Sequence, residues 1–182
     1  MIAKLALLLA AAAGAAPDLG KLAGLVRAAV GAVTTLTVVE TDPTGQRRWA
    51  AWQEGVGDGQ ATYLALFATG NGGVTPVWSM RWPNGYEPRL RTLTEWSYRD
   101  GSIAAITVQF GAGAVEVDLF GLGADGQPRP LGKYEAAAAE WRGDAKGVPV
   151  LVLHDRQATA LKTRCLAWRA ATAVLAPVRC PA

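Results

Sequence analysis

The chain has 182 residues, of which 51% are apolar and 18% are charged. A chain of this composition buries enough apolar surface to fold, so disorder is excluded, and its length fits one domain. The net charge of +3 comes without a basic run, which argues against a nucleic-acid partner. The single histidine, His154, excludes every site that needs two imidazoles, such as an HExxH metalloprotease.

Residues 1–15 read MIAKLALLLAAAAGA and predict a secretory signal peptide. Lys4 supplies the positive start, an apolar run follows, and Ala13 and Ala15 have the A-x-A spacing of a cleavage site. The run is too short to span a bilayer, so we expect no stable membrane insertion. The prediction is therefore a secreted or periplasmic protein whose residues 16–182 form a single β-repeat domain.

Residues 18–31 are the one stretch with a helical pattern. Asp18 can cap such a helix, and Leu22, Val26 and Val30 share one face. We expect a short N-terminal helix here. Residues 135–141 (EAAAAEW) also have a helical composition, but the repeat described next predicts a strand for them.

A pattern of about 44 residues recurs along the chain. Its first mark is a tryptophan, at Trp52, Trp96 and Trp141, with spacings of 44 and 45 residues. An aspartate turn follows each tryptophan, at Asp58, Asp100 and Asp144. An apolar strand then begins each time, at 61–67, 103–110 and 148–153. Recurrence of the same features in the same order indicates an internal repeat.

The strand patterns indicate an all-β fold. Residues 33–40 are rich in β-branched side chains, and glycine-rich links between strands predict hairpin loops. Alternation in 103–110 and 115–119 predicts half-buried antiparallel strands with one wet face. Residues 148–153 are apolar on both faces and should form a central, covered strand. We expect an antiparallel meander or sandwich of about three propeller-blade-like repeats.

The Asp-Gly turn before an apolar strand resembles the blades of FG-GAP or VCBS-type β-propeller proteins. The resemblance implies a propeller-like repeat, and in those families the turn is often a calcium loop with several carboxylates. Each turn in this chain has one carboxylate, which cannot supply the oxygen cage of a hard cation. We therefore expect structural turns and no metal. Three units are also fewer than a closed propeller needs.

Two cysteines, Cys165 and Cys180, predict one disulfide in an exported chain. The alternative is a catalytic cysteine that uses His154, but the sequence offers no third group to orient such a pair.

Aromatic side chains near the Pro83–Gly85 turn are the candidate binding residues. Trp78 and Trp82 share a strand face, and Tyr86 lies on the turn. If this face is outward, it forms a platform for a sugar ring or a protein partner. If it is inward, these residues form sheet core, which is also the role expected of the three repeat tryptophans.

Glu116 and Asp118 lie on one strand face about 7 Å apart, which is on the scale of an inverting glycosidase. Neighbouring carboxylates on a wet strand face are the alternative interpretation. His154 ends an apolar strand, where we expect a structural role. The sequence predicts no catalytic residue and no cofactor.

The hypothesis that follows is an exported, non-catalytic protein that binds a macromolecule. The partner would be a protein, for example an enzyme that it inhibits, or a glycan of the cell envelope. A small secreted glycan hydrolase that uses carboxylates is one alternative, and a structural building block of a homo-oligomer is another.

Overall fold

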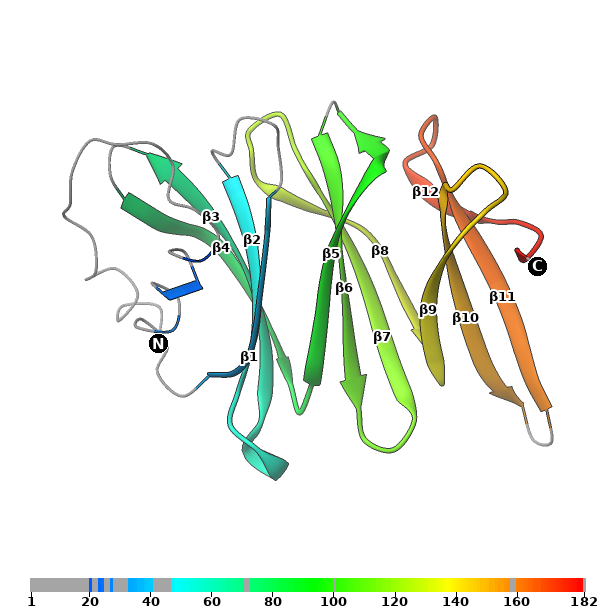
Figure 1. The fold of residues 1–182 in the computed structure, drawn as a ribbon, viewed down its shortest axis with the longest axis horizontal. Coiled ribbons are helices and arrows are strands. Elements are labelled where there is room, and N and C mark those ends of the chain that lie inside the picture. The colour runs from blue at the N-terminus through cyan, green and yellow to red at the C-terminus, as the bar shows by residue number, and fades with distance from the viewer. Residues whose placement is uncertain are drawn as a thin grey trace. The chain divides into compact units, whose positions relative to one another are not determined.

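The computed structural model describes residues 20, 23–24, 27, 33–40, 47–70, 73–99, 101–157 and 160–181. Within these residues the fold is all-β, with twelve strands in three antiparallel four-stranded sheets (Figure 1). The signal peptide and most of the expected helix at 18–31 lie outside the described residues. No helix in the described part of the chain is long and apolar enough to cross a membrane. The chain divides into two compact units, residues 1–92 and 93–182.

The first sheet belongs to the first unit, and its strands pair in chain order. They are β1 (Val33–Glu40), β2 (Arg47–Glu54), β3 (Ala61–Gly70) and β4 (Gly73–Pro83). One face carries a core of Ala50, Trp52, Ala65 and Phe67, with Leu36, Val38 and Tyr63 packed beside it. The other face carries buried Trp49, Leu64 and Leu66.

The second unit contains the third sheet and the second sheet from Leu93 onward, because the boundary between the units falls within β5. The second sheet contains β5 (Tyr86–Tyr98), β6 (Gly101–Phe110), β7 (Ala114–Leu122) and β8 (Pro128–Ala136) in that order. The third contains β12 (Val174–Pro177), β11 (Ala160–Arg169), β10 (Pro149–Gln157) and β9 (Ala138–Gly143). Both sheets contribute to one core, which includes Leu93, Trp96, Val117, Leu119, Leu151 and Leu153.

Three tryptophans tie the second and third sheets together. Trp96 on β5 meets Trp141 on β9 edge to face at 5.4 Å and stacks on Trp168 of β11 at 6.0 Å. The indole Nε1 of Trp168 donates a 3.0 Å hydrogen bond to the carbonyl of Ser97. These contacts join residues 45 to 72 positions apart in the chain, so they depend on the packing of the two sheets.

The predicted strands are confirmed. Residues 33–40 form β1, and the three apolar stretches of the repeat lie in β3, β6 and β10. β10 pairs with β9 on one side and β11 on the other, and Pro149–Leu153 are buried, as expected of a central strand. Residues 135–141 are not a helix: Glu135 and Ala136 end β8, Ala137 forms a bend, and β9 begins at Ala138.

The three repeat tryptophans begin comparable strand series. Trp52 lies on β2, Trp96 on β5 and Trp141 on β9, and each strand is followed by a turn and a buried strand. In the second and third sheets the tryptophan strand is an edge strand, whereas in the first sheet β1 lies outside it. Three strands in each sheet therefore follow the same order from the tryptophan strand, and in the first sheet the fourth strand, β1, lies before the tryptophan strand.

The prediction that the 115–119 strand has one solvent-exposed face is wrong. Val117 and Leu119 point into the core, as the alternation predicts, but Glu116 and Asp118 on the other face of β7 are only 8% and 5% exposed. Glu116 accepts a 2.7 Å salt bridge from Lys133, which lies directly opposite Asp118 on β8. A cation beside buried carboxylates offsets part of their desolvation cost, so polar alternation does not require a wet face here.

The predicted disulfide is confirmed: Cys165 on β11 is bonded to Cys180. It tethers the segment after β12 to the face of the third sheet that is turned away from the main core. Val178 packs there against Val150 and Val152, and its N–H donates to the carbonyl of Cys165 at 2.9 Å. A small satellite core therefore lies beneath the C-terminal segment.

Candidate functional site

Two loops meet at one end of the first sheet. The β2–β3 loop covers residues 55–60 and includes a single turn of 3₁₀ helix (Gly57–Gly59). The β4–β5 turn covers residues 83–87. Asn84 N–H donates to the carbonyl of Gln60 at 3.0 Å, so the two loops are bonded to each other. Residues 55–60 and 83–87 are called the loop pair below.

The buried side chain of Gln53 forms hydrogen bonds to both loops of the loop pair. Its side chain is only 8% exposed, and its Oε1 accepts a 3.0 Å hydrogen bond from the N–H of Glu87. Its Nε2 donates to the carbonyl of Gly55 at 3.3 Å and to Oε1 of Gln60 at 3.4 Å. A buried amide must satisfy its polar atoms, so Gln53 fixes both loops in one geometry.

The backbone of the loop pair contains a cluster of left-handed residues. Gly55 and Gly57 have φ of 73° and 62°, and Asn84 and Glu87 have φ of 60° and 47°. Glu87 is the unusual case, because a long side chain rarely adopts this conformation. The bond from its N–H to Gln53 helps to hold it there. Left-handed backbone held by surrounding structure is often found where a protein contacts a ligand.

The tip of the loop pair exposes an apolar side chain. Val56 is 75% exposed, more than Met80 or Val174, the other large apolar side chains that stand out on the described surface. Asp58 is exposed on the same loop, and Tyr86 is half-buried on the other. The loop pair therefore presents one exposed apolar side chain, Val56, with an exposed carboxylate on the same hydrogen-bonded loop.

The structure does not place Trp78, Trp82 and Tyr86 on one exposed platform. Trp82 is only 4% exposed, which conflicts with a surface role. Trp78 is half-buried and lies edge-on to Trp49, with ring centroids 5.7 Å apart. Both tryptophans share a face of the first sheet with buried Leu64 and Leu66, so they join its core. Of the three predicted residues, Tyr86 belongs to the loop pair.

Sequence reasoning missed Val56 and Gln53. A signal for Val56 was present, because EGVGDG at 54–59 places one apolar residue among three glycines. No local pattern marks Gln53, since its bond to Glu87 spans 34 residues.

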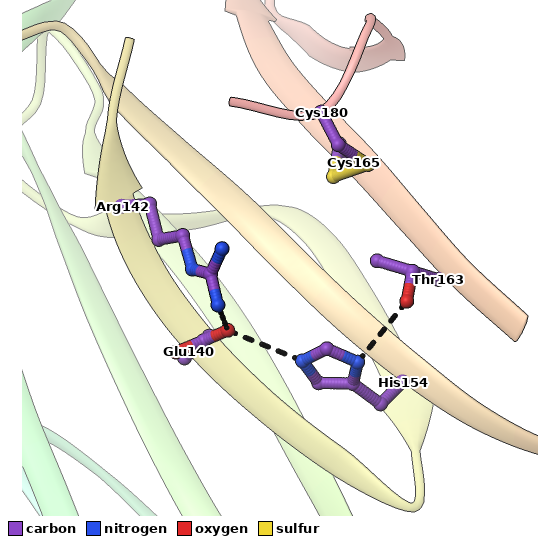
Figure 2. The surroundings of a disulfide bond; sticks show 6 residues. All are labelled: Glu140, Arg142, His154, Thr163, Cys165 and Cys180. Atoms are coloured by element: carbon purple, nitrogen blue, oxygen red, sulfur yellow. Dashed lines mark hydrogen bonds and ion pairs between the residues drawn. A yellow bond between two sulfur atoms is a disulfide. The ribbon is translucent and has the colours of Figure 1, made fainter. Parts of the chain in front are cut away.

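His154 lies in a polar cluster on the third sheet (Figure 2). Its two ring nitrogens lie 3.2 Å from Thr163 Oγ1 and 3.2 Å from Glu140 Oε1, and Arg142 pairs with the same Glu140 oxygen at 2.8 Å. The hydrogen bonds from His154 and Arg142 hold the pKa of Glu140 below its ordinary value. The cluster ties three neighbouring strands together, which favours the structural role expected of His154.

The order Thr163, His154, Glu140 has the residue types of a nucleophile, a base and an orienting acid. Such a triad also needs donors for an oxyanion. β10 pairs on both sides at His154, whereas β12 pairs only with Leu166–Arg169 of β11 and does not reach Thr163. The three residues have the order of a triad, and their hydrogen bonds also account for the structural role expected of His154.

Glu116 and Asp118 are poorly placed for glycan hydrolysis. Both are buried, and Glu116 is bonded to Lys133. The hydrogen bond to Glu116 raises the pKa of Lys133, as expected for an ammonium that is stabilised by a carboxylate. A sugar chain would have to displace this contact to reach either carboxylate.

In the part of the chain that the structure describes, no group of three or more His, Cys, Asp or Glu side chains could hold a metal ion. Comparison with protein-family models, with curated proteins and with solved structures found no match for this chain. The geometry of the described residues therefore carries the functional argument alone.

Proposed function

We propose that this chain is an exported, non-catalytic β-repeat protein that binds a protein partner through the loop pair. The observation that carries the proposal is the exposure of Val56, at 75%, on a loop fixed by buried Gln53. An enzyme that the protein inhibits is one such partner, because a rigid protruding loop fits a concave surface.

The physical advantage of the loop pair is its preorganisation. Binding normally costs conformational entropy when a loop becomes ordered, and hydrogen bonds already made in the free protein reduce that cost. An apolar side chain that enters a partner pocket contributes most of the gain at such a contact. Gln53 and the bond from Asn84 to Gln60 provide the order, and Val56 provides the apolar group.

A protein partner is favoured over an envelope glycan. Sugar rings stack on exposed flat aromatic faces, and Trp82 is buried while Trp78 and Tyr86 are half-buried. Val56 lacks such a face. A glycan array with the purified chain would contradict this preference if it gave binding that survives Val56→Asp.

Export and the repeat are part of the same proposal. The disulfide supports an oxidising compartment, where such bonds persist. The three sheets, each with a tryptophan strand followed by a buried strand, support propeller-blade-like repeats of the kind that the FG-GAP and VCBS resemblance implies.

The test is a pull-down from envelope extract with the purified chain and two variants. Val56→Asp places a charge at the tip and should abolish capture of a specific protein. Val174→Asp changes the second exposed valine, 44% exposed on the β11–β12 hairpin, and should leave capture unchanged. Capture of the same protein by Val56→Asp, or no specific capture at all, refutes the proposal. Unchanged thermal unfolding of both variants shows that neither result comes from misfolding.

Gln53→Ala tests whether rigidity matters. It removes the hydrogen bonds that fix the loops but leaves Val56 in place, so we expect binding to weaken at least tenfold, mainly by slower association. Undiminished affinity would show that the loops need no preorganisation.

A further inference from the structure

The outer edge of β1 is a second candidate binding surface. β1 is the terminal strand of the first sheet, and among the described strands it pairs with β2 alone. Its eight residues read VTTLTVVE. The strand is rich in β-branched side chains, has no proline, lysine or arginine, and ends with its one charge, Glu40.

The other edge strands carry features that discourage pairing. β4 contains Pro76 and Pro83, β5 contains Pro88, and β8 contains Pro128 and Pro130. β9 and β12 are short, with six and four residues. Proline removes a ladder donor, and short edges offer few groups to a second chain. β1 has neither protection.

The apolar residues on one face of the first sheet also extend as far as its edge strand β1. One row across the first sheet reads Leu36, Trp52, Tyr63, Arg81, and the next reads Val38, Ala50, Ala65, Ser79. Both rows end in an exposed polar residue on β4, whereas on β1 they end in half-buried apolar ones. A strand added beside β1 would cover Leu36 and Val38, and a strand added beside β4 would bury polar groups.

We propose that β1 pairs antiparallel with β1 of a second copy of this chain, across a twofold axis, so that two first sheets join into one. The pairing is isologous, and it keeps the Leu36 faces of both copies on the same side. In one such register Thr37 lies opposite Thr37, and Leu36 lies opposite Val38. Because Glu40 is the only charge, no like charges meet across the pair. The inference is independent of the loop pair.

The first measurement is the mass in solution by light scattering and sedimentation, from about 1 to 100 μM, a range in which a Kd in the micromolar region is visible. We expect a dimer. Thr35→Lys puts a charge on an exposed position of the edge and should weaken association at least tenfold. Thr94→Lys makes the same change at an exposed position of edge strand β5 and should leave the dimer intact.

The second measurement is crosslinking. The native cysteines are bonded to each other, so Thr37→Cys gives the chain one available thiol that should form a covalent dimer on mild oxidation. Leu36→Cys tests the neighbouring register, in which Leu36 faces itself. Ser79→Cys on the β4 edge is the matched control and should stay monomeric. A monomeric parent chain over the whole concentration range overturns the proposal, whether solvent or its own N-terminal segment covers β1. A dimer unaffected by Thr35→Lys, with no crosslink at either position, overturns it as well.

Discussion

Removal of the disulfide should destabilise the second unit by about 3 kcal/mol. The perturbation is the double change Cys165→Ala and Cys180→Ala, which keeps small apolar groups where Cys165 packs against Val150 and Val152. The bond closes a loop with a sequence separation of 15. In the chain-entropy model, opening a loop of this size raises the conformational entropy of the unfolded chain, which lowers the free energy of the unfolded state by about 3 kcal/mol.

A urea titration with pulse proteolysis measures the effect, with surviving fragments identified by mass. For a unit of this size the urea dependence is about 1.5 kcal/mol per molar, so the midpoint of residues 93–182 should fall by about 2 M. The midpoint of residues 1–92 is the internal reference and should not move.

Val178→Ala serves as the matched control for packing. It trims the satellite core that the disulfide segment covers but keeps the bond, and we expect a loss of about 1 kcal/mol. If the double cysteine variant loses no more stability than Val178→Ala, the tether has no entropic effect and the reasoning fails.

Two further predictions concern the second unit. Gly121→Ala should cost about 1–3 kcal/mol, because a Cβ at this position would overlap the ring of Tyr98, and Tyr98→Ala should relieve most of that cost in a double-mutant cycle. Additive losses would contradict it. Glu140→Gln should reduce the acid sensitivity of the unit. The pKa of Glu140 is lowered by His154 and Arg142, so its stabilising contribution is present above the ordinary carboxyl value and is lost as pH falls through the lower folded value. The variant should therefore show a flatter dependence of its urea midpoint between about pH 5 and pH 3, and an unchanged profile would refute the assignment.

Local patterns predicted the strands well, because the alternation of apolar and polar residues that marks a strand lies within the strand's own sequence. Residues 148–153 are apolar on both faces and form the central strand β10, and the tryptophan spacing marks the strands that begin each series. The two cysteines predicted their bond, since no alternative partner exists in the chain.

Burial on the second face of a strand was beyond the sequence. Glu116 and Asp118 alternate with core residues as wet side chains do, yet they are buried beside Lys133. Trp82 is the converse case, because a tryptophan near a turn suits both a platform and a core. What covers a face is decided by residues distant in the chain, and the bond between Gln53 and Glu87 that fixes the loop pair is equally distant.

The stacked and edge-on tryptophans of the second unit also have an optical consequence. Trp96 lies within 6.0 Å of both Trp141 and Trp168, and indole transitions at such distances couple as excitons. The circular dichroism of this trio should therefore contain a split band that vanishes when the second and third sheets separate, even if each sheet keeps its strands. The split band thus reports, without any added label, whether the second and third sheets are packed against each other.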